Sequence, residues 1–143
     1  SVDFIVTSPP YPNTYDYYLY HKLRMYWLDF NVRKIQENEI GSRHKHSSKK
    51  EGVDSYIKDM KMCFKQFNRV LKPDKYFAIV EGDSIIAGKM IKGDDLIEEI
   101  AGDNFEVVDK LYYSLNHSSK CFNPAFRNKE KEEHILLLRN RKQ

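Results

Sequence analysis

The stretch that decides the fold is VDFIVTSPPYPNTYDYY, residues 2–18. It opens with an apolar run of the kind that forms a strand, and it then meets two consecutive prolines, Pro9 and Pro10. Proline lacks a backbone N–H, has a fixed φ angle and holds the residue before it in extended backbone. A glycine turn would have been the simpler way to reverse the chain. The sequence therefore predicts a short buried strand over residues 2–7 that ends in a rigid turn.

The rest of the chain alternates between helical and strand patterns. Apolar residues at helical spacing predict helices over residues 14–30, from Asp54 to residue 71, and from about Asp94. We expect the apolar and aromatic side chains of the first two helices to lie in the core. Apolar runs predict strands over residues 76–80, 105–115 and 134–140. Together these favour an α/β fold with a mostly parallel sheet, helices on both faces and an antiparallel terminal pair.

Length and composition point to a folded domain. The chain has 143 residues, 41% of them hydrophobic and 31% charged, which is enough to bury a core and excludes a disordered chain. Cys63 and Cys121 lie far apart without zinc-finger spacing, so no disulfide framework or zinc site is expected. No apolar run of about 18 residues and no signal peptide is present, so we expect a cytoplasmic protein that makes no contact with a membrane.

The proline turn is a candidate binding site. In open α/β sheets ligands bind at the carboxyl ends of strands, which is where Ser8, Pro9, Pro10 and Tyr11 fall. The prolines hold carbonyl acceptors in fixed directions, Ser8 adds a hydroxyl, and Tyr11 adds a flat ring. Acceptors beside a stacking ring suit a planar group with an exocyclic amine, such as adenine or cytosine. The alternative is a rigid strand-to-helix turn without a ligand.

Further residues are candidates for lining the same pocket. Glu81, Gly82 and Asp83 follow the strand of residues 76–80 at its carboxyl end, although an ordinary turn between strand and loop would look the same. The remaining candidates lie before and after the proline turn, and they are Thr7, Asp16 and Tyr17. Asp16 and Tyr17 fit the start of a helix equally well.

A polar loop is predicted over residues 31–52, and it carries a basic cluster. The cluster consists of Arg43, His44, Lys45, His46, Lys49 and Lys50. It suits either a solvated loop or contacts to DNA phosphates, which position a duplex without reading its sequence. His44 and His46 lack metal-binding partners at suitable spacing, so no metal is expected.

The segment TSPPY, residues 7–11, resembles the (D/N/S)-P-P-(Y/F/W) motif of the S-adenosylmethionine-dependent amino-methyltransferases that act on DNA. Four longer blocks also resemble the corresponding blocks of prokaryotic site-specific DNA methylases, in the same order, and they span nearly the whole chain. They are SPPYPNTYDYYLYHKLRMYWLDF, IGSR, RVLKPDKYFAIVEGDS and EEHILLL. The resemblance implies a Rossmann-like methyltransferase domain, S-adenosylmethionine as cofactor and DNA as substrate, as in enzymes paired with restriction or carried on mobile elements.

The resemblance also implies a role for each residue of the turn. The Ser8 side chain and the Pro9 carbonyl would accept hydrogen bonds from the target amine, while Tyr11 would stack on a base flipped out of the duplex. Serine at the first position favours cytosine N4 over adenine N6, and both remain open. RNA base methylation and a non-catalytic DNA-binding module are the alternative functions.

One part of the family pattern is missing. Such enzymes bind the cofactor through a glycine-rich turn of the F-x-G-x-G type, and the six glycines of this chain form no such cluster. The chain also lacks an initial Met and opens almost directly on a strand. We therefore expect residues 1–143 to be a single domain, the catalytic-motif half of a longer methyltransferase domain. By itself it should lack tight cofactor binding and activity, and its partner would be the missing half or a second copy.

Overall fold

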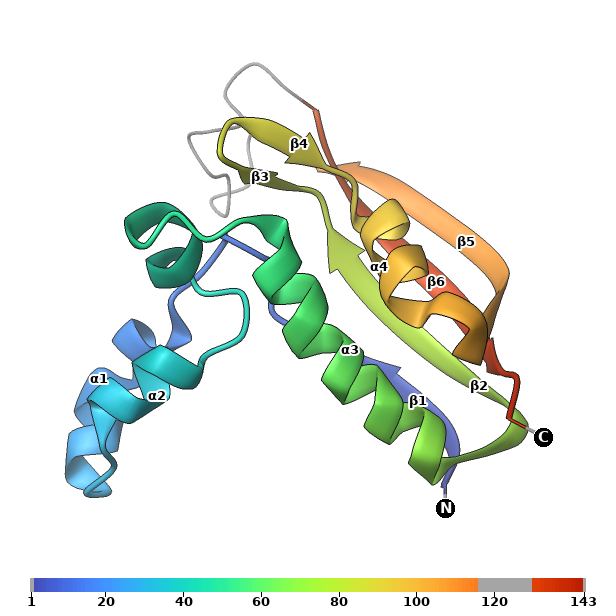
Figure 1. Cartoon of the computed structure of the whole chain (residues 1–143), viewed down its shortest axis with the longest axis horizontal. Helices are drawn as coiled ribbons and strands as arrows, with labels where there is room; N and C mark the ends of the chain where they lie inside the picture. The colour runs from blue at the N-terminus through green and yellow to red at the C-terminus, as the bar shows by residue number, and fades with distance from the viewer. Residues whose placement is uncertain (1, 116–129, 143) are drawn as a thin grey trace.

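The computed structural model describes residues 2–115 and 130–142, and it contains a four-stranded sheet with helices (Figure 1). The strand order is β1 (Val2–Thr7), β2 (Leu71–Gly82), β6 (Lys131–Asn140) and β5 (Phe105–Leu115). The helices are α1 (Tyr17–Trp27), α2 (Val32–Asn38), α3 (Val53–Val70) and α4 (Gly93–Ala101). Smaller elements are the π-helical turn His44–Ser48, the 3-10 turn Gly102–Asn104, and a hairpin of β3 (Ser84–Ile86) and β4 (Lys89–Ile91).

The sheet is mixed, and it is not mostly parallel as the sequence suggested. Only β1 and β2 run parallel, joined by the long helical crossover that parallel neighbours need. The strand β6 lies between β2 and β5 and runs antiparallel to both. The α/β class and the antiparallel terminal pair β5–β6 are confirmed. The prediction failed because β6 inserts beside β2, and the order of strands along the chain does not reveal this insertion.

One face of the sheet carries the core. Alternation along β2 turns Phe77 and Ile79 toward α3 and α4, and all these elements contribute to one buried cluster. Phe64 of α3 contacts Phe77 and Phe105, with ring centroids 5.4 and 5.7 Å apart. A buried side chain of this size contributes roughly 1.5–3 kcal/mol. The strong amphipathic pattern of α3 therefore gave a correct prediction of a core helix.

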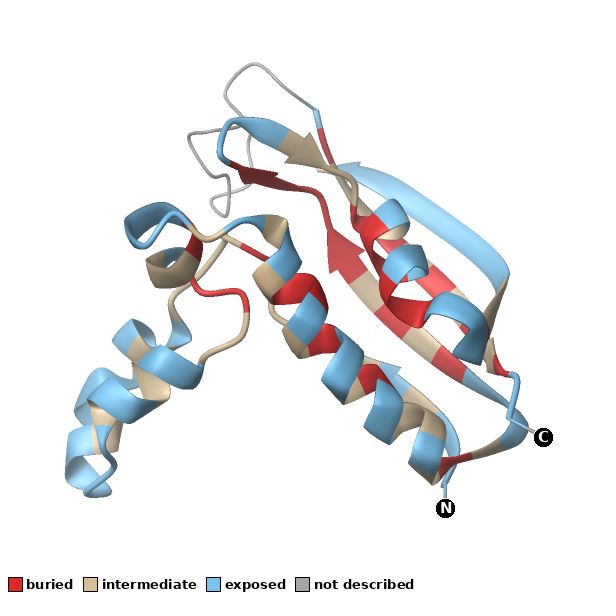
Figure 2. Ribbon diagram, in the orientation of Figure 1, coloured by how far each residue is buried: buried red, intermediate tan, exposed pale blue. Residues whose placement is uncertain are grey.

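The opposite face of the sheet is open in the described part of the chain. Large side chains on it remain exposed (Figure 2). They are Phe4, Val6, Tyr76, Leu111 and Tyr113. The predictions of helices on both faces and of a buried first strand are thus wrong for the described residues. An apolar strand predicts that both of its faces suit burial, but it does not specify which polypeptide covers them.

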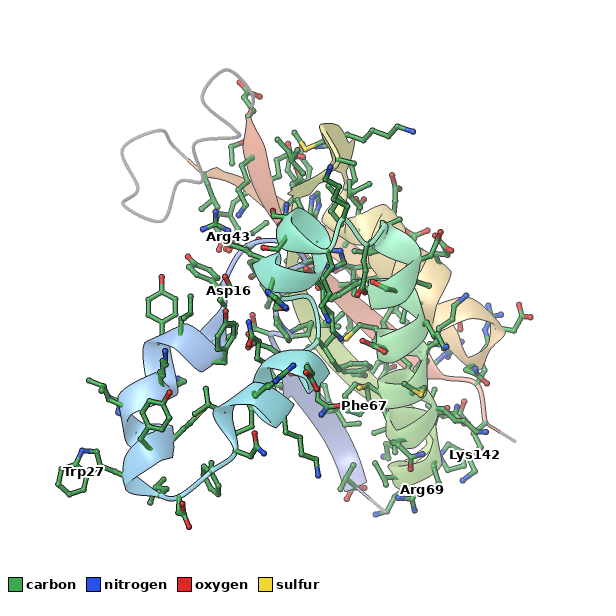
Figure 3. The ribbon with its side chains drawn as sticks, turned by 60° about the vertical axis from the view of Figure 1, so that its left-hand side comes forward. Asp16, Trp27, Arg43, Phe67, Arg69 and Lys142 are labelled. Atoms are coloured by element: carbon green, nitrogen blue, oxygen red, sulfur yellow. The ribbon has the colours of Figure 1, made fainter. Side chains whose placement is uncertain are left out.

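The α1 helix and the α2 helix form an arm that lies away from the sheet (Figure 1). No residue of α1 is buried, and Trp27, near its far end, is 90% exposed (Figure 3). The expectation that these aromatic residues belong to the core was wrong. The helix itself was predicted correctly, although it is shorter than residues 14–30.

The segment of residues 31–52 is not a continuous loop. It contains α2, which begins after Asn31, whose side chain accepts a hydrogen bond from the Lys34 N–H at 3.0 Å. The π-helical turn His44–Ser48 follows. Polar composition hid both elements, because a short solvated helix has no apolar stripe to mark it.

No helix within the two described ranges is long and apolar enough to cross a membrane.

Candidate functional site

The proline turn lies where two parallel strands end. Thr7, the last residue of β1, pairs with Ile79 of β2, so Ser8–Tyr11 leaves the sheet beside the carboxyl end of β2. The end of the turn is anchored by Asn13, which has a φ of 57° and whose backbone N–H donates to the Gly41 carbonyl at 2.8 Å. Its side-chain amide donates to the Ile85 carbonyl at 2.7 Å. The turn is therefore held in place by β1 on one side and by Asn13 on the other.

Tyr11 is half-buried against β2. A Cβ atom at Gly82 would lie 2.7 Å from two carbons of the Tyr11 ring, so glycine is the residue that lets this ring reach the strand. The Lys131 ammonium lies 5.7 Å from the ring centroid, and the Ser8 hydroxyl lies 3.5 Å from the Tyr11 hydroxyl. Burial raises the pKa of Tyr11 to about 12, so the ring stays neutral at physiological pH. The structure thus brings Gly82 and Tyr11 together at the sheet edge.

Ser8 differs from its neighbours in being exposed, which leaves its hydroxyl accessible at the mouth of the sheet. The Pro10 carbonyl faces inward instead, and it accepts a hydrogen bond from the Tyr56 hydroxyl of α3 at 3.0 Å. The turn therefore presents one side to solvent and is attached to the core by the other.

Glu81 occupies the last core-facing position of β2 and is fully buried. Its Oε2 lies 3.1 Å from the Tyr56 hydroxyl, and its Oε1 has no hydrogen-bond partner among the described residues. Burial raises the pKa of Glu81 well above its usual value, against the opposing effects of Tyr56, the Gly82 amide and Lys131. Glu81 therefore does not line an open pocket, and it lies behind the turn.

Asp83 is also buried, and it joins three elements. Its carboxylate accepts hydrogen bonds from the Gly93 N–H at the start of α4 at 3.1 Å, from the Lys92 ammonium at 3.0 Å, and from the Glu132 N–H of β6 at 3.2 Å. The His134 Nε2 lies 2.8 Å from the same carboxylate. Burial disfavours the charged form, but the hydrogen bonds from Gly93, His134, Lys92 and Glu132 outweigh it and lower the pKa of Asp83.

Asp83, Glu132 and His134 offer ligand atoms within 4.8 Å of one another. However, the Lys92 ammonium donates to both carboxylates, at 3.0 and 2.8 Å. A cation already sits between the acidic groups, so this cluster is an internal ion-pair network. Sequence reasoning missed Lys92 and named no partner for His134, although a histidine at the start of the apolar run of residues 134–138 was a signal of a buried polar group.

Asp16 and Tyr17 form hydrogen bonds with segments other than the proline turn. Asp16 accepts a hydrogen bond from the His44 N–H at 3.0 Å, and the Tyr17 N–H donates to the Glu39 carboxylate at 2.6 Å. Figure 3 shows Asp16 close to Arg43. A shallow pocket of about 340 Å³ on α1 is lined by Tyr15, Tyr17, Tyr20 and His21. Asp16 therefore fastens the basic segment to the start of α1, and its place in a base pocket stays a prediction.

The basic cluster divides into inward and outward residues. The Lys45 ammonium pairs with Asp59 of α3 at 3.1 Å, and His46 is buried with its Nδ1 3.0 Å from the Glu51 carbonyl. Exposed side chains are those of Arg43, Lys49 and Lys50, while His44 is half-buried. Arg43, Lys49 and Lys50 are therefore the residues of this cluster whose charges face solvent.

Comparison with known proteins shows the family of the chain. The chain matches the family described as DNA methylase, the N6/N4 methyltransferases, over residues 2–143. No curated protein is similar enough to count as a match. A crystal structure of a Thermus thermophilus protein, provisionally assigned as a DNA modification methylase, superposes with a TM-score of 0.52 at 18% identity. The match covers the whole of this chain and 46% of that one, so this chain spans about half of the length of the solved protein. The chain therefore belongs to the N6/N4 DNA methylase family.

Proposed function

We propose that this chain is the base-facing part of a DNA methyltransferase that transfers a methyl group from S-adenosylmethionine to an exocyclic amine, cytosine N4 or adenine N6. One observation carries the proposal. The Ser8–Tyr11 turn stands at the carboxyl ends of β1 and β2, with an accessible hydroxyl on Ser8 and a neutral ring on Tyr11. These are the groups that an amine on a flat base requires.

The reaction needs positioning and a suitable electrostatic environment more than it needs a covalent intermediate. The Ser8 hydroxyl and the Pro9 carbonyl accept hydrogen bonds from the target amine and concentrate electron density on its nitrogen. The Tyr11 ring stacks on the base after it has left the duplex, and base–aromatic stacking contributes about 1–3 kcal/mol. The Tyr11 ring packs closely against Gly82, which restricts the movement of this platform.

The family implies use of S-adenosylmethionine, but the described residues do not form a site for it. A ribose would need an acidic side chain at the end of a strand. The two acidic residues at the end of β2 are both buried and turned inward, Glu81 toward Tyr56 and Asp83 toward Lys92.

The partner that supplies the cofactor site is proposed to bind the open part of the sheet. β1 is an edge strand of the sheet, so its outer edge has no neighbour among the described strands. The exposed residues Phe4 and Val6 continue the apolar open face up to this edge. The other half of the methylase domain, or a second copy of this chain, would bury both.

The exposed basic residues are proposed to bind DNA phosphates. Replacing Lys49 and Lys50 by alanine should weaken DNA binding at all sequences, because phosphate contacts are independent of sequence. The slope of log affinity against log salt should fall by about one for each removed contact. Fluorescence anisotropy at several salt concentrations measures this slope. Lys75→Ala, an exposed lysine in β2, is the matched control, and an equal effect there would contradict a specific phosphate contact.

Tyr11→Ala tests the base platform in the full-length protein. Loss of stacking should lower methyl transfer to duplex DNA by about 5- to 150-fold, from the 1–3 kcal/mol that stacking contributes. Tyr11→Phe keeps the ring and should retain most of the activity. Tyr112→Ala removes an exposed tyrosine from β5 and is the control. Duplex binding measured in parallel should change little, since phosphates supply most of its affinity.

The alternative functions give different results in the same experiment. Preferred methylation of a short RNA over duplex DNA would indicate an RNA base methyltransferase. A non-catalytic DNA-binding module would give a different pair of results. The wild-type protein would transfer no methyl group, and Tyr11→Ala would bind DNA as tightly as wild type.

A further inference from the structure

Glu81 stands at a position where the strand pattern calls for an apolar residue. It follows Phe77 and Ile79 on the core-facing side of β2, and all three side chains are fully buried. An ionised carboxylate in such a place costs several kcal/mol unless it is paired and hydrogen-bonded. The asparagine Asn140 at the other end of the sheet is also buried, but it has several hydrogen-bond contacts, whereas Glu81 has one side-chain partner among the described residues. The presence of Glu81 is therefore not explained by packing.

The geometry around Tyr56 restricts the protonation state of this group. The Tyr56 hydroxyl has a single hydrogen, yet it lies 3.0 Å from the Pro10 carbonyl oxygen and 3.1 Å from Glu81 Oε2. A carbonyl oxygen only accepts, so the Tyr56 hydrogen must point at Pro10 if that contact is a hydrogen bond. The contact with Glu81 is then favourable only if the carboxyl group carries a proton and donates it.

We propose that Glu81 and Tyr56 are positioning residues for the proline turn, acting as a relay in which the protonated Glu81 carboxyl donates to the Tyr56 hydroxyl and Tyr56 donates to the Pro10 carbonyl. This inference rests on the proposed function for its meaning in catalysis. The relay itself is a property of the folded chain. It holds the peptide between Pro10 and Tyr11 on the side that faces α3. The Tyr11 ring packs against Gly82.

Ionisation of Glu81 breaks the relay. A carboxylate attracts the Tyr56 hydrogen more strongly than a neutral carbonyl does, because charge-assisted hydrogen bonds are about twice as strong. The Pro10 carbonyl would then face the oxygen lone pairs of Tyr56. The turn would lose its attachment to α3 at high pH and keep it at low pH.

The groups that face Glu81 come from every element around it. Tyr56 approaches from α3, Tyr11 from the turn, and Lys131, Glu133 and His134 from β6, where His134 pairs with Glu81 across the ladder. Burial, the largest effect, raises the pKa of the Glu81 carboxyl and Glu133 raises it further, whereas Tyr56, the Gly82 amide and Lys131 lower it.

The sign of the linked stability follows from this. A carboxyl whose pKa is raised on folding binds a proton that the unfolded chain has already released. Its contribution to the free energy of unfolding is therefore fully present at low pH. It decreases as the pH rises from the ordinary glutamate range toward the raised pKa of Glu81.

Carbon-13 NMR of the 143-residue chain tests the relay directly. The Glu81 carboxyl resonance should stay at the protonated position over the pH range in which the other glutamates ionise. The Pro10 carbonyl resonance should move with the same midpoint as Glu81. Titration of Glu81 together with the other glutamates would overturn the relay, and so would a Pro10 resonance that ignores it.

Two substitutions separate the relay from simple packing. Glu81→Gln keeps a donor at every pH, so the Pro10 resonance should become independent of pH and the free energy of unfolding should exceed that of wild type increasingly as the pH rises. Tyr56→Phe keeps the ring and removes the hydroxyl, so the Pro10 resonance should take the free value throughout. Tyr26→Phe, an exposed tyrosine on α1, is the matched control. A Pro10 resonance that neither Glu81→Gln nor Tyr56→Phe alters would overturn the proposal.

Activity of the full-length protein separates the relay from the proposed methyltransferase function. Tyr56→Phe should lower kcat by about five- to tenfold, the equivalent of one lost hydrogen bond, and leave DNA affinity unchanged. An equal loss in DNA affinity would contradict a positioning role. If the wild-type protein transfers no methyl group to DNA, the proposed function fails, and the NMR titration still decides the relay.

Discussion

Replacing Asp83 with alanine is expected to lower the free energy of unfolding by about 3–5 kcal/mol, because its buried carboxylate accepts several hydrogen bonds, one of them from an ammonium group. The substitution removes the acceptor for the Gly93 N–H and the Lys92 ammonium, and it removes the partner of the His134 Nε2. A loss of this size is a large fraction of the roughly 5–15 kcal/mol that typically separates folded from unfolded protein. Urea denaturation of the two proteins gives the difference directly.

The same carboxylate sets a dependence on acid. Because its pKa is lowered in the folded chain, the contribution of Asp83 is present above the ordinary aspartate pKa and is lost as the pH falls through the lower folded value. Stability of the wild type should therefore fall at acid pH more steeply than that of Asp83→Asn. Asp103→Ala removes an exposed carboxylate and serves as control. A loss no larger than that of Asp103→Ala would show that Asp83 does not join β2, α4 and β6.

Replacing Ser8 with alanine in the full-length protein is expected to lower kcat for methyl transfer by about 100-fold. Removing one preorganised polar group that acts on the reacting atoms typically has an effect of this size. Ser8 is exposed just after β1, and its hydroxyl makes one long hydrogen bond within the described part of the chain, to the Tyr11 hydroxyl, so the fold should not depend on it.

DNA affinity and thermal stability should be unchanged in Ser8→Ala. Ser114→Ala, an exposed serine of β5, is the matched control. Single-turnover kinetics with anisotropy on the same samples separates the chemical step from binding. Parallel losses in kcat and DNA affinity would show that Ser8 binds DNA and does not act on the amine.

Local sequence patterns predicted where helices and strands form better than they predicted which side chains are buried. Residues 54–71 have a strict helical apolar pattern and form the core helix α3, and the double proline ended β1 where it was expected to. Trp27 and Tyr20 have the same type of pattern in α1, yet both are exposed. Periodicity records that a helix has an apolar side, but the surface that covers this side must come from another part of the fold or from a partner.

The exposed turn of the candidate site could be recognised in the sequence, whereas the contacts of its buried residues could not. The Ser8–Tyr11 turn was recognisable because prolines at a strand end are unusual. Glu81 and Asp83 lie at the carboxyl end of β2, but the direction of their side chains depends on Tyr56 and Lys92, which lie 25 and 9 residues away along the chain. Such partners are set by tertiary packing, and no local pattern encodes them.

The identity of the methylated nucleoside tests the central claim most directly. Duplex DNA is incubated with the full-length protein and S-adenosylmethionine, digested, and analysed by mass spectrometry. We expect N4-methylcytosine or N6-methyladenine, and we expect Ser8→Ala to abolish most of the product. Methylation at a ring carbon, such as 5-methylcytosine, would contradict the assignment of the proline turn to an exocyclic amine, as would DNA that remains unmethylated.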